Sequence, residues 1–336
     1  MRYIIIGAGA VGGSIGGRLH EAGQDVVLVA RGAHHRALRE HGLRLTTPAG
    51  TLQLDVPVVD RPEDVGLRDG DVLVLAVKTQ DSVAALDTWA ARPVAGGGTA
   101  GERLPVVCAQ NGVENERLAL RRFRQVYGMC VVLPSTFLTP GAIAAPCGPY
   151  TGALVLGRYP AGADDTARRI AAGLEKSAFL APVVPDVMRW KYGKLLGNLA
   201  NAVEAVCGHD TGAEARDLTA RAKAEGAAVL AAAGIAATGG AELADLRRDA
   251  VEVQPLGDGE RALGSSWQSL VRGAGSIETD HLNGEIVLLG REHAVPTPVN
   301  ELLQRAANDS ARGHREPGAL TAAALAALLD GPRAGS

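Results

Sequence analysis

The sequence predicts an α/β protein in which a doubly wound sheet domain precedes an all-helical domain. Short apolar runs alternate with helical segments in the first half, as in a parallel sheet covered by helices. A glycine-rich loop at residues 7–12 directly follows the first apolar run. After Asp186, a suitable helix N-cap, the chain becomes rich in Ala and Leu with helical periodicity.

Strands and helices are expected where these patterns are clearest. Val72–Val77 consists almost wholly of Val, Leu and Ala, which is typical of a strand buried on both faces. Thr136–Gly157 places Gly, Pro and Thr between short β-prone runs, which favours a hairpin at the edge of the sheet. The other expected strands are Tyr3–Ile6, Asp25–Ala30, Pro105–Ala109 and Cys130–Pro134, and the expected helices are Gly12–Ala22, His35–His41, 187–206, 213–234, 241–251, 266–272, 277–293 and 299–312.

The texture of the chain changes near Pro182–Pro185. We therefore expect a sheet domain at residues 1–184 and a helical domain at 185–330. The short tail at 331–336 is expected to be disordered.

Composition limits the partners that the protein can have. The chain has 336 residues, a formal net charge of −3, no basic arm and only 3% aromatic residues, which argues against nucleic acid. The apolar start at Tyr3–Ile6 is too short for a signal peptide, and no apolar stretch reaches the roughly 20 residues of a membrane span. We therefore expect a cytoplasmic protein without a membrane partner. The cysteines form no CxxC pair, so buried thiols are expected and no metal site; they are Cys108, Cys130, Cys147 and Cys207.

The glycine loop Gly7-Ala8-Gly9-Ala10-Val11-Gly12 is a G-x-G-x-x-G between a strand and a helix. In this context Gly7 permits the tight turn, Gly9 lets the backbone approach a pyrophosphate, and Gly12 lets the helix pack on the strand. The helix N-terminus then offers free N–H groups and a partial positive charge to the phosphates. The loop predicts dinucleotide binding by a Rossmann-type domain; the alternative is a merely structural turn.

The end of the second strand indicates which dinucleotide binds. An NAD site usually has an acidic residue there, whereas here Arg31 follows Ala30, and Asp25 lies at the opposite end of the strand. Arg31 can pair with a 2′-phosphate, so we expect NADPH/NADP+; the alternative is a solvated surface arginine.

Two more strand ends carry candidate ligand contacts. Lys78 follows the strand that ends at Val77, and Asn111 follows Gln110 after the next strand, where its amide can hydrogen-bond the cofactor or the substrate. Ligands of α/β sheets bind at the carboxyl ends of strands. Asn-Gly is also a common turn pair, so Asn111 has a structural interpretation of equal weight.

The first helix of the second half brings polar residues onto one face. At about 100° per residue, Lys191, Lys194, Asn198 and Asn201 lie within an arc of roughly 80°, beside an apolar stripe. Amides and lysines at the border of a core are costly unless they meet ligands or one another. The alternative is a solvated helix face.

A second candidate cluster contains hydroxyl and carboxylate groups. Ser265 and Ser266 precede Ser276-Ile277-Glu278-Thr279-Asp280, in which Glu278 stands at an expected helix start. The helix dipole favours a carboxylate at that place, so charge complementarity at a helix end is the alternative to a binding role for Glu278.

Together these residues resemble the ketopantoate reductase family over nearly the whole chain. The motifs occur in the family's order; they are the glycine loop, Ala30-Arg31-Gly32, Val77-Lys78-Thr79, Gln110-Asn111-Gly112, Lys194-Leu195 with Asn198, Ser265-Ser266, Ile277-Glu278-Thr279-Asp280 and Val295-Pro296-Thr297-Pro298. The resemblance implies an active site in a cleft between a Rossmann domain and a helical domain.

The resemblance also implies a role for each site residue. Lys194 would be the general acid and Glu278 the substrate-binding carboxylate of the catalytic site. Arg31 and Lys78 would contact NADPH. Further polar contacts to the substrate would come from Asn111, Asn198 and Ser266. The family has a second asparagine where this chain has Ala202, and Asn201, the nearest amide, is expected to contact the substrate as well.

The expected activity is the NADPH-dependent reduction of a small 2-keto acid, with ketopantoate to pantoate in pantothenate and coenzyme A biosynthesis as the leading case. A related oxidoreductase acting on another 2-keto or 2-hydroxy acid stays open, as does a non-catalytic NADPH-binding protein. Lys191 either tunes the pKa of Lys194 or lies on the surface. The sequence does not decide the oligomeric state, a homodimer included.

Overall fold

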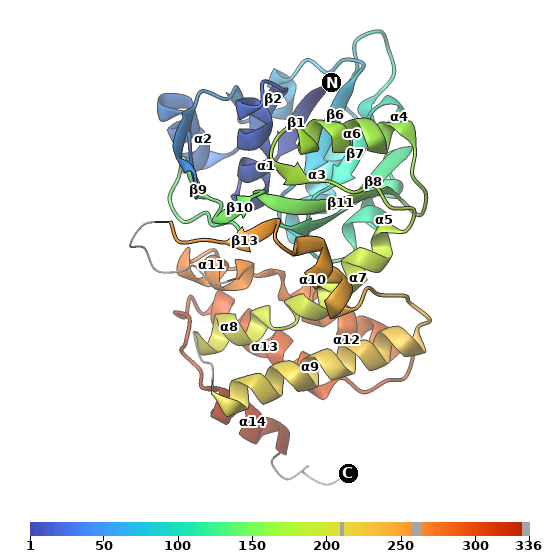
Figure 1. The fold of residues 1–336 in the computed structure, drawn as a ribbon. Helices are drawn as coiled ribbons and strands as arrows, with labels where there is room; N and C mark the ends of the chain where they lie inside the picture. The colour runs from blue at the N-terminus through green and yellow to red at the C-terminus, as the bar shows by residue number, and fades with distance from the viewer. Residues whose placement is uncertain (209–211, 257–263, 331–336) are drawn as a thin grey trace. The chain divides into compact units, whose positions relative to one another are not determined.

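The computed structural model describes residues 1–208, 212–256 and 264–330, and the expected tail at 331–336 lies outside them. Contacts divide the chain into two units, which are residues 1–191 with 238–260, and residues 192–237 with 261–336 (Figure 1). The division expected from the sequence, at 184/185, does not include this return of the chain to the first unit.

The first unit contains an eight-stranded sheet with the order β12-β11-β8-β7-β6-β1-β2-β5. Only β11 is antiparallel to its neighbour β8, and the pairs from β8 to β5 are all parallel. The strands are β1 Arg2–Ile6, β2 Asp25–Val29, β5 Val58–Val59, β6 Asp71–Leu75, β7 Pro105–Cys108, β8 Gln125–Val132, β11 Gly152–Arg158 and β12 Phe179–Leu180. The chain order reverses at β1, which confirms the doubly wound sheet.

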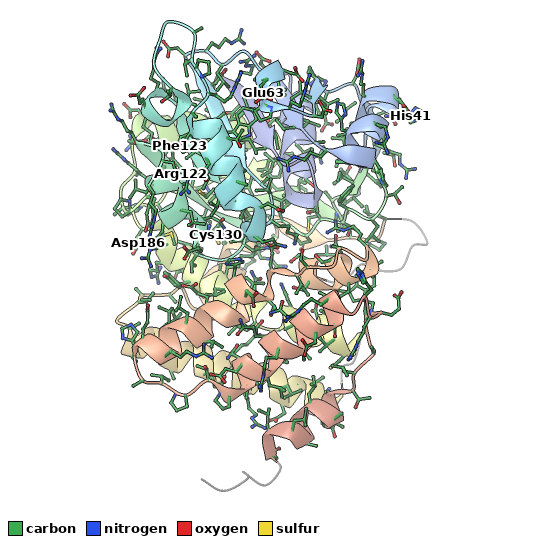
Figure 2. All side chains as sticks on the ribbon, turned by 180° about the vertical axis from the view of Figure 1, so that it is seen from behind. His41, Glu63, Arg122, Phe123, Cys130 and Asp186 are labelled. Carbon is green, nitrogen blue, oxygen red and sulfur yellow. The ribbon has the colours of Figure 1, made fainter. Side chains whose placement is uncertain are left out.

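Helices cover both faces of this sheet, because its central strands β1 and β6 are apolar at every position after the first residue. Tyr3 and Ile5 of β1 face one buried cluster, which also contains Ile15 and Leu19 of α1. Ile4 and Ile6 face the other, which contains Trp89 of α3 and Phe123, labelled in Figure 2. The helices of this unit are α1 Ala10–Glu21, α2 Gly32–His41, α3 Ser82–Ala90, α4 Ala100–Arg103, α5 Asn115–Leu120, α6 Asp165–Glu175 and α10 Gly240–Arg247, and short 3-10 helices lie at η1 Pro62–Asp64 and η2 Thr79–Asp81.

The hairpin expected over 136–157 is wrong. This segment supplies β9 Ala142–Ala144, β10 Cys147–Pro149 and β11, which join three different sheets. Pro146 and Pro149 lack the N–H groups that a continuous ladder needs, so each short strand finds its own partner. β9 extends the unforeseen hairpin of β3 Leu43–Thr47 and β4 Gly50–Leu54, while β10 pairs with β13 Val251–Val253.

The second unit is helical, as expected, but two helices are divided. The helix expected at 187–206 ends at Asn198 and resumes at Asn201, and the one expected at 277–293 is interrupted at Leu282. The amide of Asn283 donates to the carbonyl oxygen of Leu199 at 3.2 Å, which satisfies a group that the break exposes. The elements are α7 Val187–Asn198, α8 Asn201–Cys207, α9 Ala213–Ala232, α11 Ser265–Val271, η3 Glu278–His281, α12 Asn283–Glu292, α13 Pro298–Arg312 and α14 Ala322–Asp330.

Several expected properties can be compared with this fold. All four cysteines are buried and form no disulfide, as expected. No helix in the described part of the chain is both long enough and apolar enough to cross a membrane. The same residues contain no cluster of three or more His, Cys, Asp or Glu side chains arranged to hold a metal ion.

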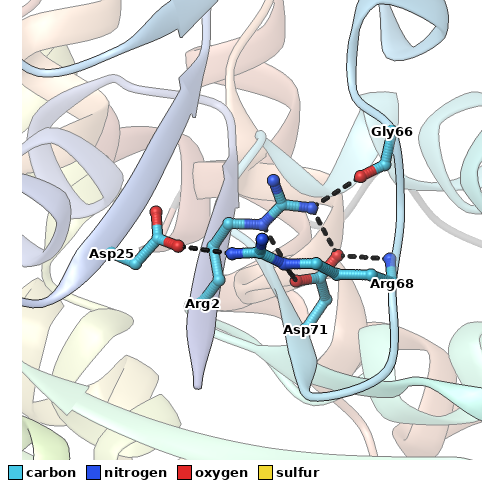
Figure 3. Close-up of polar contacts among 5 residues, drawn as sticks. All are labelled: Arg2, Asp25, Gly66, Arg68 and Asp71. Atoms are coloured by element: carbon cyan, nitrogen blue, oxygen red, sulfur yellow. Dashed lines mark hydrogen bonds and ion pairs between the residues drawn. The ribbon is translucent and has the colours of Figure 1, made fainter.

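An ion-pair network joins the amino ends of three neighbouring strands (Figure 3). Asp71 accepts two hydrogen bonds from the guanidinium of Arg2, at 2.9 and 2.7 Å, and one from the N–H of Arg68 at 2.9 Å. Arg68 donates to Asp25 at 2.6 Å. The side chain of Asp71 is fully buried, and its hydrogen bond raises the pKa of Arg2. Asp71 therefore holds together the amino ends of the central strands, at the end of the sheet opposite to the glycine loop.

We expect Asp71→Ala to lower the free energy of unfolding by about 3–5 kcal/mol, because it leaves Arg2 partly buried without its partner. The measurement is urea unfolding of the variant. Asp69→Ala is the matched control, since Asp69 pairs with Arg103 at an exposed position and should contribute about 1 kcal/mol or less. Equal losses in the two variants would contradict the structural role of Asp71.

Candidate active site

The glycine loop turns tightly from β1 into α1. Gly7 has φ +100°, and a Cβ there would lie 2.8 Å from the backbone nitrogen of Val77. The N–H groups of Gly7 and Ala8 both donate to the carbonyl oxygen of Val29, at 3.1 and 3.2 Å. The loop is thereby held between the carboxyl ends of β2 and β6, at the reversal point of the sheet.

The start of α1 is open to a ligand. Gly9 is its N-cap and supplies no side-chain cap, and a Cβ on Gly9 would meet only the ring of Phe137, at 4.0 Å. Within the described chain the N–H groups of Ala10, Val11 and Gly12 donate no hydrogen bond to the backbone before them. These donors and the positive end of the helix dipole suit a pyrophosphate.

Arg31 is the N-cap of α2 and is exposed, directly after the carboxyl end of β2. The first turn of α2 carries no acidic side chain. A guanidinium and a helix N-terminus therefore stand together at the position where the sequence analysis expects a 2′-phosphate.

Lys78 and Asn111 follow β6 and β7, and both are half-buried. Behind them lies a buried polar network that the sequence analysis missed. The amide of Gln110 donates to the carbonyl oxygen of Val77 at 3.0 Å and to Ser82 at 2.7 Å. Ser82 donates to Asn115, which in turn donates to Thr79 at 3.1 Å. The network ties the two strand-end loops together.

The surface position considered for Lys191 in the sequence is wrong, because this residue is buried. Its side chain is 2% exposed and forms an ion pair with the fully buried Glu116 of α5. Burial raises the pKa of Glu116, and the ammonium of Lys191 partly offsets this effect. Val187, one turn earlier in α7, packs so closely on Gly128 and Gly157 that a Cβ at either glycine would clash with its side chain. The first half of α7 is therefore built into the sheet unit.

Lys194 and Asn198 lie one turn apart in the second half of α7, and both are half-buried. The amide nitrogen of Asn198 is buried and finds no hydrogen-bond partner among the described residues. Asn201 does not continue this face, because the break at residues 199–200 makes it the first residue of α8. Its carboxamide oxygen lies beside Gly264, where a Cβ would be 3.3 Å away.

The hydroxyl and carboxylate candidates are buried in the helical unit. Ser266, in α11, is 2% exposed, and the neighbouring hydroxyl of Ser265 is buried without a partner in the described chain. Glu278 is 5% exposed and begins the four-residue η3 instead of a long helix, so a helix dipole accounts poorly for its carboxylate. Burial lowers the pKa of Arg272, and the carboxylate of Glu278 partly offsets this; the sequence analysis did not single out Arg272.

Comparison with known proteins finds matches to one protein family in both halves of the chain. The family model for ketopantoate reductase PanE/ApbA matches residues 3–160, and the model for its C-terminal part matches residues 186–310. A 2-dehydropantoate 2-reductase of Mesorhizobium japonicum is 30% identical over 327 residues, which cover 89% of this chain and 94% of the relative. Against one from Pyrococcus abyssi, 29% identity extends over 202 residues, 60% of this chain and 62% of that relative.

A solved structure shows the same architecture. The PanE/ApbA family ketopantoate reductase of Ralstonia eutropha superposes with a TM-score of 0.76 at 28% identity, over 94% of this chain and 99% of that one. The chain therefore belongs to the ketopantoate reductase PanE/ApbA family of oxidoreductases that act on CH–OH groups.

Proposed function

We propose that this protein reduces a small 2-keto acid with NADPH, and that 2-dehydropantoate, which becomes pantoate for pantothenate synthesis, is its substrate. The observation that carries this proposal is the buried side-chain amide nitrogen of Asn198, one turn after Lys194, which has no hydrogen-bond partner among the described residues. A buried donor without an acceptor costs about 1–3 kcal/mol. The carboxylate or ketone oxygen of a keto acid would satisfy it.

The first unit fits a dinucleotide with a 2′-phosphate. The open backbone at Gly9 and the donors of the first turn of α1 would hold the pyrophosphate. Arg31, exposed at the start of α2, would pair with the 2′-phosphate, and no acidic residue in that turn opposes it. Lys78 and Asn111 would contact the cofactor from the ends of β6 and β7.

The chain's own residues would hold the keto acid and manage the proton. The nicotinamide supplies the hydride that adds to the ketone carbon. As the C=O π bond breaks, negative charge grows on oxygen, where the Lys194 ammonium would stabilise it and then donate a proton from Nζ. Asn198 and Ser266 would hold the carboxylate and ketone oxygens, and Glu278 would accept from a substrate hydroxyl. The neutral amine of Lys194 regains its proton from solvent.

A different 2-keto acid is the second candidate. It is favoured by Ala202, which is buried at 1% exposure and offers no amide where the family has a second asparagine. Comparing kcat/KM for ketopantoate with values for pyruvate and bulkier 2-keto acids would separate the two candidates.

Turnover of ketopantoate tests the cofactor assignment. We expect kcat/KM with NADPH to exceed that with NADH by about tenfold or more, since one charge-assisted contact contributes about 1.5–3 kcal/mol. Arg31→Ala should remove most of this preference, whereas Arg39→Ala, at the exposed far end of α2, should retain it. Equal use of both cofactors by the wild type would overturn the NADPH assignment.

The two lysines of α7 should respond differently to substitution. Lys194→Ala should lose about 10²–10⁴ in kcat while NADPH binding and thermal stability stay near the wild-type values, because a general acid typically contributes that much. Lys191→Met should instead lose about 3–5 kcal/mol of stability, because it leaves Glu116 buried without its partner. Kinetics and urea unfolding of both variants measure this. The reverse pattern would assign the acid to Lys191.

Glu278 should act on the substrate. We expect Glu278→Gln to raise KM for ketopantoate about tenfold, since a hydrogen bond to a charged group contributes about 1.5–3 kcal/mol, with the Kd for NADPH unchanged. Glu292→Gln, at the exposed end of α12, serves as the control. A Glu278 variant with normal kinetics and a lower melting temperature would indicate a purely structural carboxylate.

A further inference from the structure

His34 joins the glycine loop to two other segments of the sheet unit. Its Nε2 lies 2.7 Å from the carbonyl oxygen of Ala8, and its Nδ1 lies 3.0 Å from the backbone nitrogen of Gly141. Its ring packs against that of Phe137, with 4.4 Å between centroids. A residue of α2 thus bridges the loop after β1 and the segment before β9.

These contacts define the tautomer of His34. The N–H of Gly141 can only donate, so Nδ1 must carry a lone pair. The carbonyl of Ala8 can only accept, so Nε2 must carry the proton. The ring is therefore neutral, in agreement with the burial that lowers its pKa.

The contact with Ala8 completes the support of the loop. The N–H groups of Gly7 and Ala8 donate to Val29, and the carbonyl of Ala8 accepts from His34. The peptide group between Ala8 and Gly9 is thereby oriented, and the donors that follow it at the start of α1 keep a fixed direction.

The other contacts of His34 hold the segment at residues 137–141 near the glycine loop. Phe137 lies next to the open position at Gly9, 4.0 Å from where a Cβ would stand. Gly141 has φ +80°, and a Cβ there would press on Ala37 of α2 at 3.1 Å. His34 and Gly141 therefore hold the 137–141 segment against α2, which keeps Phe137 beside Gly9 of the loop.

We propose that neutral His34 is a positioning residue for the dinucleotide phosphates, acting through the carbonyl of Ala8. This inference rests on the proposed function, since it needs a dinucleotide at the loop. His34 itself touches no phosphate in this proposal. It sets the direction of the N–H groups that do.

Replacing His34 by Gln or by Asn distinguishes its hydrogen bond to Ala8 from its hydrogen bond to Gly141. Gln places an amide nitrogen near Nε2 and can still donate to Ala8, whereas Asn reaches only the position of Nδ1. We expect His34→Leu and His34→Asn to raise the Kd for NADPH about threefold to tenfold, and His34→Gln to stay within about twofold of the wild type. KM for the keto acid at saturating NADPH should not change.

Fluorescence titration with NADPH, with the melting temperature measured in parallel, gives the result. His41→Gln is the control, because His41 lies at the exposed far end of α2 (Figure 2). If His34→Leu binds NADPH like the wild type, or if affinity falls in all three variants only as the melting temperature falls, this inference is wrong while the proposed function stands. A wild type that binds no NADPH overturns both.

Discussion

The close approach of α1 to β1 is the constraint on which the rest of the sheet unit depends. A Cβ at Gly12 would overlap the carbonyl oxygen of Gly7 and lie 3.0 Å from side-chain atoms of Ile5 and Ala76. Only glycine lets the helix begin so near the strand. Because α1 begins there, the N–H groups of its first turn, which have no backbone partner within the described chain, lie at the reversal point of the sheet, between the carboxyl ends of β2 and β6. The place of the proposed dinucleotide phosphates is thus set first by the close packing of α1 on β1.

The parallel strands could be predicted because a strand buried on both faces is apolar at every position, as Asp71–Leu75 is after its first residue. The breaks in the helices expected at 187–206 and 277–293 could not be predicted, because they depend on contacts between residues that are far apart in the sequence. The end of α7 is satisfied by Asn283, 84 residues after Leu199. The helical periodicity of residues 187–206 contains no sign of that partner. The hairpin of β3 and β4 was missed although Leu43 and Leu45, both buried, alternate with exposed Arg44 as in a half-buried strand.

The same distinction applies to the site. Residue types in a motif identify a candidate such as Lys194 or Glu278, because the chemistry needs that functional group. The residues that hold the site together carry no local signal. His34 meets a backbone nitrogen 107 residues later, and Lys191 meets a carboxylate 75 residues earlier. Gln110 stood beside Asn111 in the sequence, yet only the folded chain shows that its amide binds Val77 and Ser82. The residues that support the site are recognised only by their hydrogen-bond and ion-pair partners in the folded chain.

Burial also separates two lysines that helical spacing alone treats as equivalent. A general acid must reach the reacting oxygen and must recover its proton from solvent after each turnover. Lys191 is poorly suited to exchange with solvent, since its side chain is 2% exposed and its ammonium is paired with a carboxylate that is itself fully buried. Lys194 is half-buried, and the next turn of its helix carries Asn198, whose side-chain amide nitrogen has no partner in the part of the chain that the structure describes. A buried ion pair contributes little net stability compared with apolar residues of the same shape, yet it is severely disrupted by the loss of one partner. Lys191 therefore holds the helix in place, and its burial favours the half-buried Lys194 as the proposed general acid.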